Sequence, residues 1–164
     1  MDVIEAIKKR ASVRAYKPAP VPREVLEALV DCGRRAPSAL GHHPWQFVVV
    51  TDRDRLREIA ECTDYGRFIA DAAACIAVLC EDGKYYLEDG CAAVENILIA
   101  TVALGLGACW VAGDKKPYAD QVRDVLGAPA SQKLVALLPV GFPASQPKPK
   151  PKPGLERVLH WERY

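Results

Sequence analysis

The longest apolar stretch of the chain, CAAVENILIATVALGLGACWVAG at residues 91–113, limits the possible folds more than any other feature. It is long enough to suggest a membrane span. However, Glu95 and Asn96 place polar groups in its first third, and Gly105 and Gly107 interrupt it near its end. These polar residues and glycine breaks argue against a membrane span. The stretch is better explained as a buried central helix followed by a strand. We therefore expect a soluble protein built around this helix, with no membrane partner.

Shorter apolar segments on both sides of this stretch alternate between strand-like and helix-like patterns. The expected strands cover residues 45–51, 73–80, 108–112 and 133–141, and the expected helices cover residues 2–9, 22–36, 52–62, 85–105 and 118–127. Pro22 suits the first position of its helix, and Gly127 suits the end of the last helix. The pattern predicts four strands interleaved with four or five helices in one layered α/β domain.

Charge and cysteine usage exclude several classes of protein. The formal net charge of +1 at pH 7 provides no broad positive field for nucleic acid, so any recognition of anions must be local. The six cysteines include no pair at C-x-x-C spacing, and most lie in apolar segments. This favours reduced, buried thiols in the cytoplasm over a disulfide framework. The N-terminal sequence MDVIEAIKKR is acidic and amphipathic, unlike a secretory signal peptide, and a cytoplasmic location is expected.

The C-terminal segment, FPASQPKPKPKPGLERVLHWERY, has two distinct parts. Its alternating prolines and lysines exclude a helix or a central strand and favour an extended polyproline II conformation. The last ten residues are too few to fold alone, yet they include Leu155, Leu159 and Trp161. We expect residues 1–142 to form the folded body and residues 143–164 to form an arm that docks on another molecule, most simply a second copy of the chain.

A cationic cluster lies close to the N-terminus. Arg10, Ser12 and Arg14 are two residues apart, so an extended backbone would point all three side chains to one side. Guanidinium groups and a hydroxyl suit a phosphomonoester or a carboxylate. The alternative is a solvated face after a helix C-terminus, where cations are mildly favoured.

Other candidate sites are weaker. The stretch APSALGHHPW could bring backbone amides close to a ligand, or it could simply connect a helix to a strand. His42 and His43 have no further ligand at metal spacing, and with His160 they do not complete a catalytic triad, so neither a metal site nor a side-chain catalyst is predicted. The arm contains Lys148, Lys150 and Lys152. They could be solubilising charges, or at least one of them could bind an anion. The stretch LGLGACWVAG follows a helix and lacks the dinucleotide-binding fingerprint.

Four segments, taken together and in this order, resemble the nitroreductase family of FMN-dependent oxidoreductases. They are RASVRAY at 10–16, RRAPSALGHHPWQFVVV at 34–50, LEDGCAAVENILIATVALGLGACWV at 87–111 and VGFPASQPKPKPKPGLERVLHW at 140–161. The resemblance implies an α+β fold with three α/β/α layers, in which helices cover both faces of a central mixed or antiparallel sheet. It also implies an intertwined homodimer with two FMN sites at the subunit interface and arms that cross onto the partner.

The resemblance also assigns cofactor-binding residues. Arg10 would lie near the pyrimidine edge of the flavin, and Ser12 and Arg14 nearer the ribityl phosphate. Ala11, within the same stretch, would also contact the cofactor. The loop that contains Pro37, Ser38, Ala39 and Gly41 would approach the same flavin from the other subunit. Ala112 and Gly113 would pass their backbone by the isoalloxazine ring, and Lys150 and Lys152 would hold the phosphate.

The chain departs from the family pattern at several positions. Gly41 and His43 stand where the family commonly has Asn and Gln, and two lysines replace a frequent Lys/Arg pair. The chain is also short and has no long insertion to build a helical lid. An open pocket, or weak retention of FMN, follows as a hypothesis.

The activity implied by the resemblance is FMN-dependent oxidation of NADH or NADPH, with electrons passed to a small organic acceptor such as a nitroaromatic compound or a quinone. The flavin would perform the chemistry, so no catalytic side chain is assigned. A flavin-binding or flavin-carrying dimer without productive NAD(P)H oxidation is the alternative, and a dehalogenase or flavin-degrading relative is a third reading. The residues do not identify the preferred donor or the natural acceptor.

Overall fold

The computed structural model describes all 164 residues and is organised around one antiparallel sheet. Its strands follow the order β1-β2-β5-β3, and β4 also pairs with β5. Their bounds are Trp45–Val50 (β1), Ala74–Glu81 (β2), Gly107–Ala108 (β3), Val111–Ala112 (β4) and Gln132–Gly141 (β5). β1 pairs with β2 alone, so its outer edge is free. An isolated parallel bridge joins Ser12 to Ala108 at the other side of the sheet.

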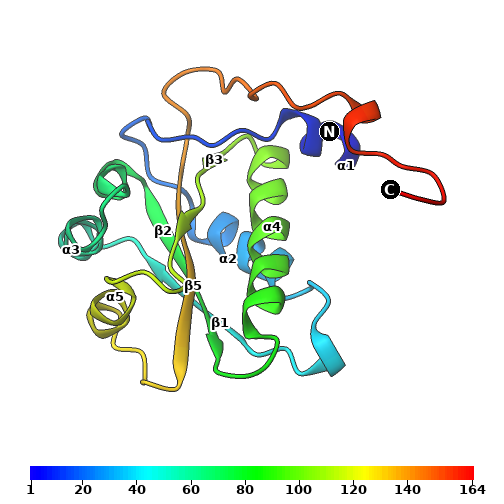
Figure 1. Ribbon diagram of the computed structural model, residues 1–164. Coiled ribbons are helices and arrows are strands. Elements are labelled where there is room, and N and C mark those ends of the chain that lie inside the picture. The colour runs from blue at the N-terminus through cyan, green and yellow to red at the C-terminus, as the bar shows by residue number, and fades with distance from the viewer.

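The chain has five helices, four of which cover the two faces of the sheet (Figure 1). The five helices are α1 (Val3–Lys9), α2 (Arg23–Gly33), α3 (Arg53–Cys62), α4 (Tyr86–Ala103) and α5 (Ala119–Val125). α2 and α4 pack on one face and α3 and α5 on the other. Short 3₁₀ turns occupy Ala39–Gly41, Arg67–Asp71 and Leu155–Arg157. The expected three-layer α/β/α architecture is confirmed.

Alternation along β2 divides the interior into two apolar cores. Ile76 and Val78 point into the core under α2 and α4, whereas Ala77 and Leu79 point into the core under α3 and α5. A bulge interrupts the pairing of β2 with β5 next to Val78 and Leu79. The buried runs in β2 and β5 explain why these segments read as continuous apolar stretches in the sequence, since both faces of the two strands are covered.

α4 is the central helix that the apolar stretch predicts. Its buried positions include Val94, Ile97 and Leu98, which belong to the core shared with α2 and the sheet. None of the helices combines the length and the hydrophobicity needed to cross a membrane.

Two expectations need correction. The strand predicted at residues 108–112 is two short strands, β3 and β4, with Cys109 and Trp110 between them. Continuing the register would set Cys109 opposite Pro139, which has no amide hydrogen, and the Pro139 carbonyl accepts a hydrogen bond from Tyr16 instead. The sheet therefore has five strands. Pro22 is the N-cap of α2 and not its first helical residue.

The C-terminal arm leaves the sheet after β5. Its root pairs with the N-terminal segment through a bridge between Tyr16 and Pro143 and through a 3.0 Å hydrogen bond from the Ala144 amide to the Ala15 carbonyl. Residues 147–154 then have no regular structure, in agreement with the proline-lysine pattern. Figure 1 shows the arm passing α1 and both termini lying on one side of the molecule.

Candidate cofactor-binding site

Residues 10–16 form an extended segment held against the end of the sheet. The Val13 amide donates to the Ala108 carbonyl at 2.9 Å, and the Tyr16 hydroxyl donates to the carbonyls of Val13 at 2.7 Å and Pro139 at 3.1 Å. Burial raises the pKa of the Tyr16 phenol well above its ordinary value. Ser12 and Arg14 flank the buried Val13 in this extended segment and are exposed.

The two arginines of this segment have different neighbours. Arg10, which ends α1, keeps only 25% of its side chain exposed, and its Nε lies 4.0 Å from Oε1 of Glu95 on α4. Arg14 is exposed and places its guanidinium carbon 5.9 Å from the centroid of the Phe68 ring. Arg14 has no acidic partner in this chain, so its guanidinium is free to bind an anion.

An open groove of about 620 Å³ runs between this segment and the root of the arm. Ser12, Arg14, Ser145, Gln146 and Lys148 supply its polar side chains, and no acidic residue lines it. Two cations, two hydroxyls and an amide are donors of the kind that bind a phosphate. Lys150 and Lys152 are exposed and lie outside this groove, whereas Lys148, which the sequence did not single out, lines it.

The loop at residues 37–43 is fixed at the N-terminal turn of α4. The Ala39 amide donates to Oδ1 of the buried Asp89 at 2.8 Å. Oγ of Ser38 accepts from the His43 amide at 3.0 Å and lies 3.1 Å from Nδ1 of the same histidine. The backbone has positive φ at Gly41, as well as at His43. Glycine and asparagine both tolerate this conformation, so Gly41 preserves the backbone geometry while removing a side-chain amide.

Ala112 and Gly113 lie where β4 ends. The Ala112 carbonyl accepts from the Tyr118 hydroxyl at 2.5 Å, and the Gly113 amide donates to the Val135 carbonyl at 3.1 Å. A Cβ on Gly113 would come within 2.5 Å of Cγ of Leu134, so only glycine fits here.

The predicted residues form two separate groups within one chain. Arg10, Ser12 and Arg14 lie beside β3 and the root of the arm. The loop at 37–43 and the end of β4 are both tied to the start of α4, through Asp89 and through the hydrogen bond from the Tyr86 hydroxyl to the Asp114 carboxylate. That hydrogen bond raises the pKa of Tyr86 to about 12. No hydrogen bond or ion pair joins the two groups.

Sequence reasoning did not assign Asp89, Phe68 or Glu95 to the site, although Asp89 and Glu95 lie in one of the segments that resemble the family. Their contacts form only when distant segments meet.

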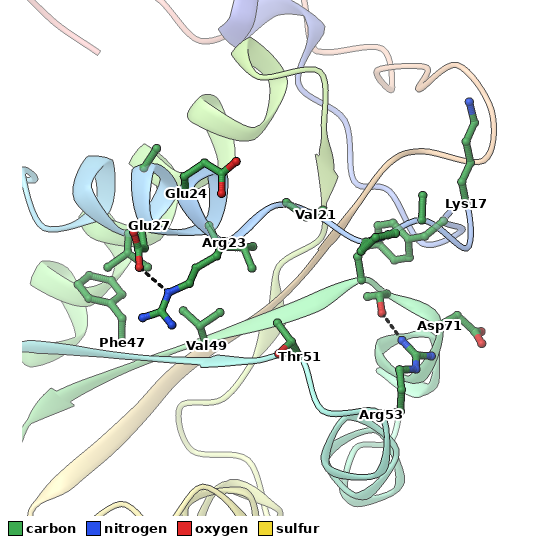
Figure 2. Close-up of a pocket in the computed structure, with 18 of the residues that line it drawn as sticks. Lys17, Val21, Arg23, Glu24, Glu27, Phe47, Val49, Thr51, Arg53 and Asp71 are labelled. Atoms are coloured by element: carbon green, nitrogen blue, oxygen red, sulfur yellow. Dashed lines mark hydrogen bonds and ion pairs between the residues drawn. The ribbon is translucent and has the colours of Figure 1, made fainter.

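A second, larger groove of about 1640 Å³ lies between α2, the free edge of β1 and the loop at residues 14–21. Figure 2 shows Phe47 and Val49 pointing from β1 toward α2, with the Arg23–Glu27 ion pair above them, and Thr51 directly after the end of the strand. Val49 keeps 38% of its surface exposed despite its position in a strand. The groove thus combines an apolar floor with a rim of paired charges.

Comparison with known proteins places the chain in a family. The family model described as "Nitroreductase family" matches residues 7–74 and 81–142, and the chain belongs to this family. A protein of Methanothermobacter thermautotrophicus, provisionally named NADH dehydrogenase/NAD(P)H nitroreductase, is 36% identical over 155 residues, which cover 90% of this chain and 80% of the relative.

Solved structures agree with this assignment. A protein of Parabacteroides distasonis with the same provisional name has a TM-score of 0.94 at 32% identity, covering 99% of this chain and 98% of its own. An FMN-dependent nitroreductase of Clostridium difficile has a TM-score of 0.92 at 26% identity, covering 98% of this chain and 99% of its own. The expected nitroreductase-like fold is therefore confirmed.

Proposed function

We propose that this protein is an FMN-dependent oxidoreductase that uses NADH or NADPH to reduce a small organic acceptor, such as a nitroaromatic compound or a quinone. Membership of the nitroreductase family and likeness to a solved FMN-dependent nitroreductase support this class. The single observation that carries the proposal is the groove lined by Ser12, Arg14 and Lys148, which offers cations and hydroxyls without any acid.

The chain's own residues would bind and orient the cofactor. A phosphomonoester carries nearly two negative charges, which Arg14 and Lys148 would offset while Ser12 donates a hydrogen bond. Arg10 would face the pyrimidine edge, and Lys150 and Lys152 would approach from an arm. FMN would supply the redox chemistry when bound, so the protein needs no catalytic acid or base of its own.

The proposed site requires a second copy of the chain. The loop at residues 37–41 and the cationic segment at 10–14 are not joined within one chain, so a loop from a partner would complete the pocket. The arm offers a means of association. Leu155 and Trp161 are 68% and 78% exposed, and the arm's last residues make no contact with the body of their own chain that buries them.

We propose that each arm end binds the large groove beside β1 of the other subunit. The apolar residues of the arm match the floor formed by Phe47 and Val49, and its alternating acidic and basic residues match the charged rim. The free edge of β1 also leaves backbone donors and acceptors for an added segment.

The ultraviolet-visible spectrum of the freshly purified protein tests the cofactor assignment. We expect a flavin spectrum, or its appearance when FMN is added to the colourless protein. The variant Arg14→Gln should bind FMN at least tenfold more weakly, because a charge-assisted contact to the phosphate is lost. Arg57→Gln, an exposed change on α3 away from the groove, is the matched control and should leave affinity unchanged. A protein that binds no FMN would contradict the proposal.

Anaerobic stopped-flow mixing with NADH and with NADPH separates an oxidoreductase from a flavin carrier. Bleaching of the flavin absorbance by either donor is the expected result. A flavin-containing protein that neither donor bleaches beyond the buffer control would favour the flavin-binding alternative.

A further inference from the structure

We propose that Phe68 positions Arg14 for binding of the anionic cofactor, by holding its guanidinium group beside the smaller groove. The inference rests on the proposed function, because it takes that groove as part of the FMN site. Phe68 lines neither of the two grooves, so its effect passes through Arg14. It is therefore a positioning residue and not a catalytic one.

The place of Arg14 between the two grooves is the first observation. Its side chain lines both of them. The smaller groove contains no acidic residue, whereas the acids that line the larger one include Glu24 and Asp71. A guanidinium that can turn toward these acids is less available to an anion in the smaller groove. A contact that restricts Arg14 would therefore strengthen anion binding, because less side-chain freedom is lost on binding.

The aromatic ring of Phe68 supplies such a contact, which is the second observation. The guanidinium carbon of Arg14 lies 5.9 Å from the ring centroid, within the range of a cation–π interaction. The other cation–π contact in the chain joins Lys84 to its neighbour Tyr85, whereas Arg14 and Phe68 come from distant segments. A guanidinium can contact a ring through its flat side and keep its N–H groups, which lie in its plane, free for an anion.

The ring is held in place by the fold, which is the third observation. Phe68 belongs to the 3₁₀ turn Arg67–Asp71. Arg53, at the start of α3, donates a hydrogen bond to the Ala72 carbonyl at 2.7 Å and so fastens the end of this turn. The ring also packs against a small buried cluster that contains Val13, the residue directly before Arg14. The ring and the backbone of Arg14 thus share one rigid support, and their contact does not depend on a ligand.

Titration of the protein with FMN, followed by flavin fluorescence, tests the inference. Phe68→Leu keeps an apolar side chain but removes the aromatic face, and we expect it to bind FMN about two- to fivefold more weakly. Phe68→Met fills more of the same space, also without an aromatic face, and should show the same loss. Phe68→Tyr keeps the ring and should bind FMN as the wild type does.

Tyr65→Leu is the matched control. Tyr65 is an aromatic residue three positions before Phe68, but it is 90% exposed and lines neither groove. Its replacement should leave the affinity for FMN unchanged.

A double-mutant cycle separates positioning from packing. In the Arg14→Gln background, Phe68→Leu should cause no further loss of affinity, because the group that the ring positions is no longer a cation. A ring that only fills space would weaken binding by the same factor in both backgrounds. Thermal unfolding of the same variants measures the loss of packing separately.

Each outcome has one meaning. A Phe68→Leu protein that binds FMN with wild-type affinity overturns the inference and leaves the proposed function intact. Equal losses in the wild-type and Arg14→Gln backgrounds assign Phe68 a purely structural role and overturn the inference as well. A Phe68→Tyr protein as weak as Phe68→Leu contradicts the role of the aromatic face. A wild-type chain that binds no FMN overturns the proposed function itself.

Discussion

Asp89 is the residue on which the position of the 37–43 loop depends most directly. It is buried, and its carboxylate accepts the Ala39 amide, which links the loop to the first turns of α4. Few other hydrogen bonds tie this loop to the body of the protein, because Ser38 and His43 bond mainly to each other.

Replacing Asp89 with alanine should therefore lower the free energy of unfolding by about 1–3 kcal/mol, the usual cost of leaving a partly buried donor without an acceptor. It should also weaken FMN binding. Urea denaturation measures the first effect and flavin fluorescence the second. Asp89→Asn retains an acceptor oxygen and should lose much less stability. Equal losses in the two variants would show that the charge, and not the hydrogen bond, matters.

The candidate side chains could be predicted from the sequence only in part. The regular spacing of Arg10, Ser12 and Arg14 is visible in the chain, and the structure places Ser12 and Arg14 together on one groove. Lys148 could not be chosen over Lys150 and Lys152, because three lysines at equal spacing in an extended segment look alike until the root of the arm is positioned.

The contact between α4 and the sheet depends on a glycine. Gly90 faces the bulged part of β5, and a Cβ at this position would come within 2.6 Å of Cγ2 of Val135 and 3.1 Å of Sγ of Cys80. The helix can approach the sheet this closely only because the side chain is absent. The same helix carries Asp89 and Glu95, so its distance from the sheet affects both groups of the site.

Gly90→Ala should destabilise the protein by about 1–3 kcal/mol, because overpacking outweighs the better helix propensity of alanine. Chemical denaturation followed by circular dichroism checks this value. Gly83→Ala, where a new Cβ would meet only the Glu81 carbonyl at 4.0 Å, should be tolerated. Equal stability of the two variants would contradict this account of the packing between α4 and β5.

Most elements follow from apolar periodicity, and the exception has a cause that is remote in sequence. The sequence predicts one strand at residues 108–112, because ACWVA is apolar and contains no breaker. The interruption arises from Pro139 on a different strand and from the Tyr16 hydroxyl that takes its carbonyl. The sequence of residues 108–112 does not reveal which residue of a strand thirty residues away will lie opposite Cys109.

The whole molecule has surfaces that one chain leaves uncovered. α1 exposes Val3, Ile4 and Ile7, and the arm exposes its apolar end. The composition of the arm indicates that it docks, but the sequence does not say where, since a groove between α2 and β1 exists only after folding.

Deletion of residues 155–164 should convert a dimer into a monomer, because the proposed contact between arm and groove is lost. Sedimentation velocity measures whether the truncated protein is a dimer or a monomer. Val49→Lys, which places a charge on the floor of the groove, should weaken association in the same way without shortening the chain. The double variant Lys150→Gln/Lys152→Gln should remain dimeric. A truncated protein that sediments as a dimer would show that other surfaces hold the subunits together.

The root of the arm has a consequence for the protein at low concentration. Pro143 and Ala144 pair with the backbone of Ala15 and Tyr16, directly beside the side chains that line the smaller groove. Any molecule that binds only the assembled form stabilises assembly by mass action, and the reverse also holds. Dilution should therefore cause the subunits to dissociate and the coenzyme to be released in one linked equilibrium. An excess of riboflavin 5′-phosphate should keep the two subunits associated.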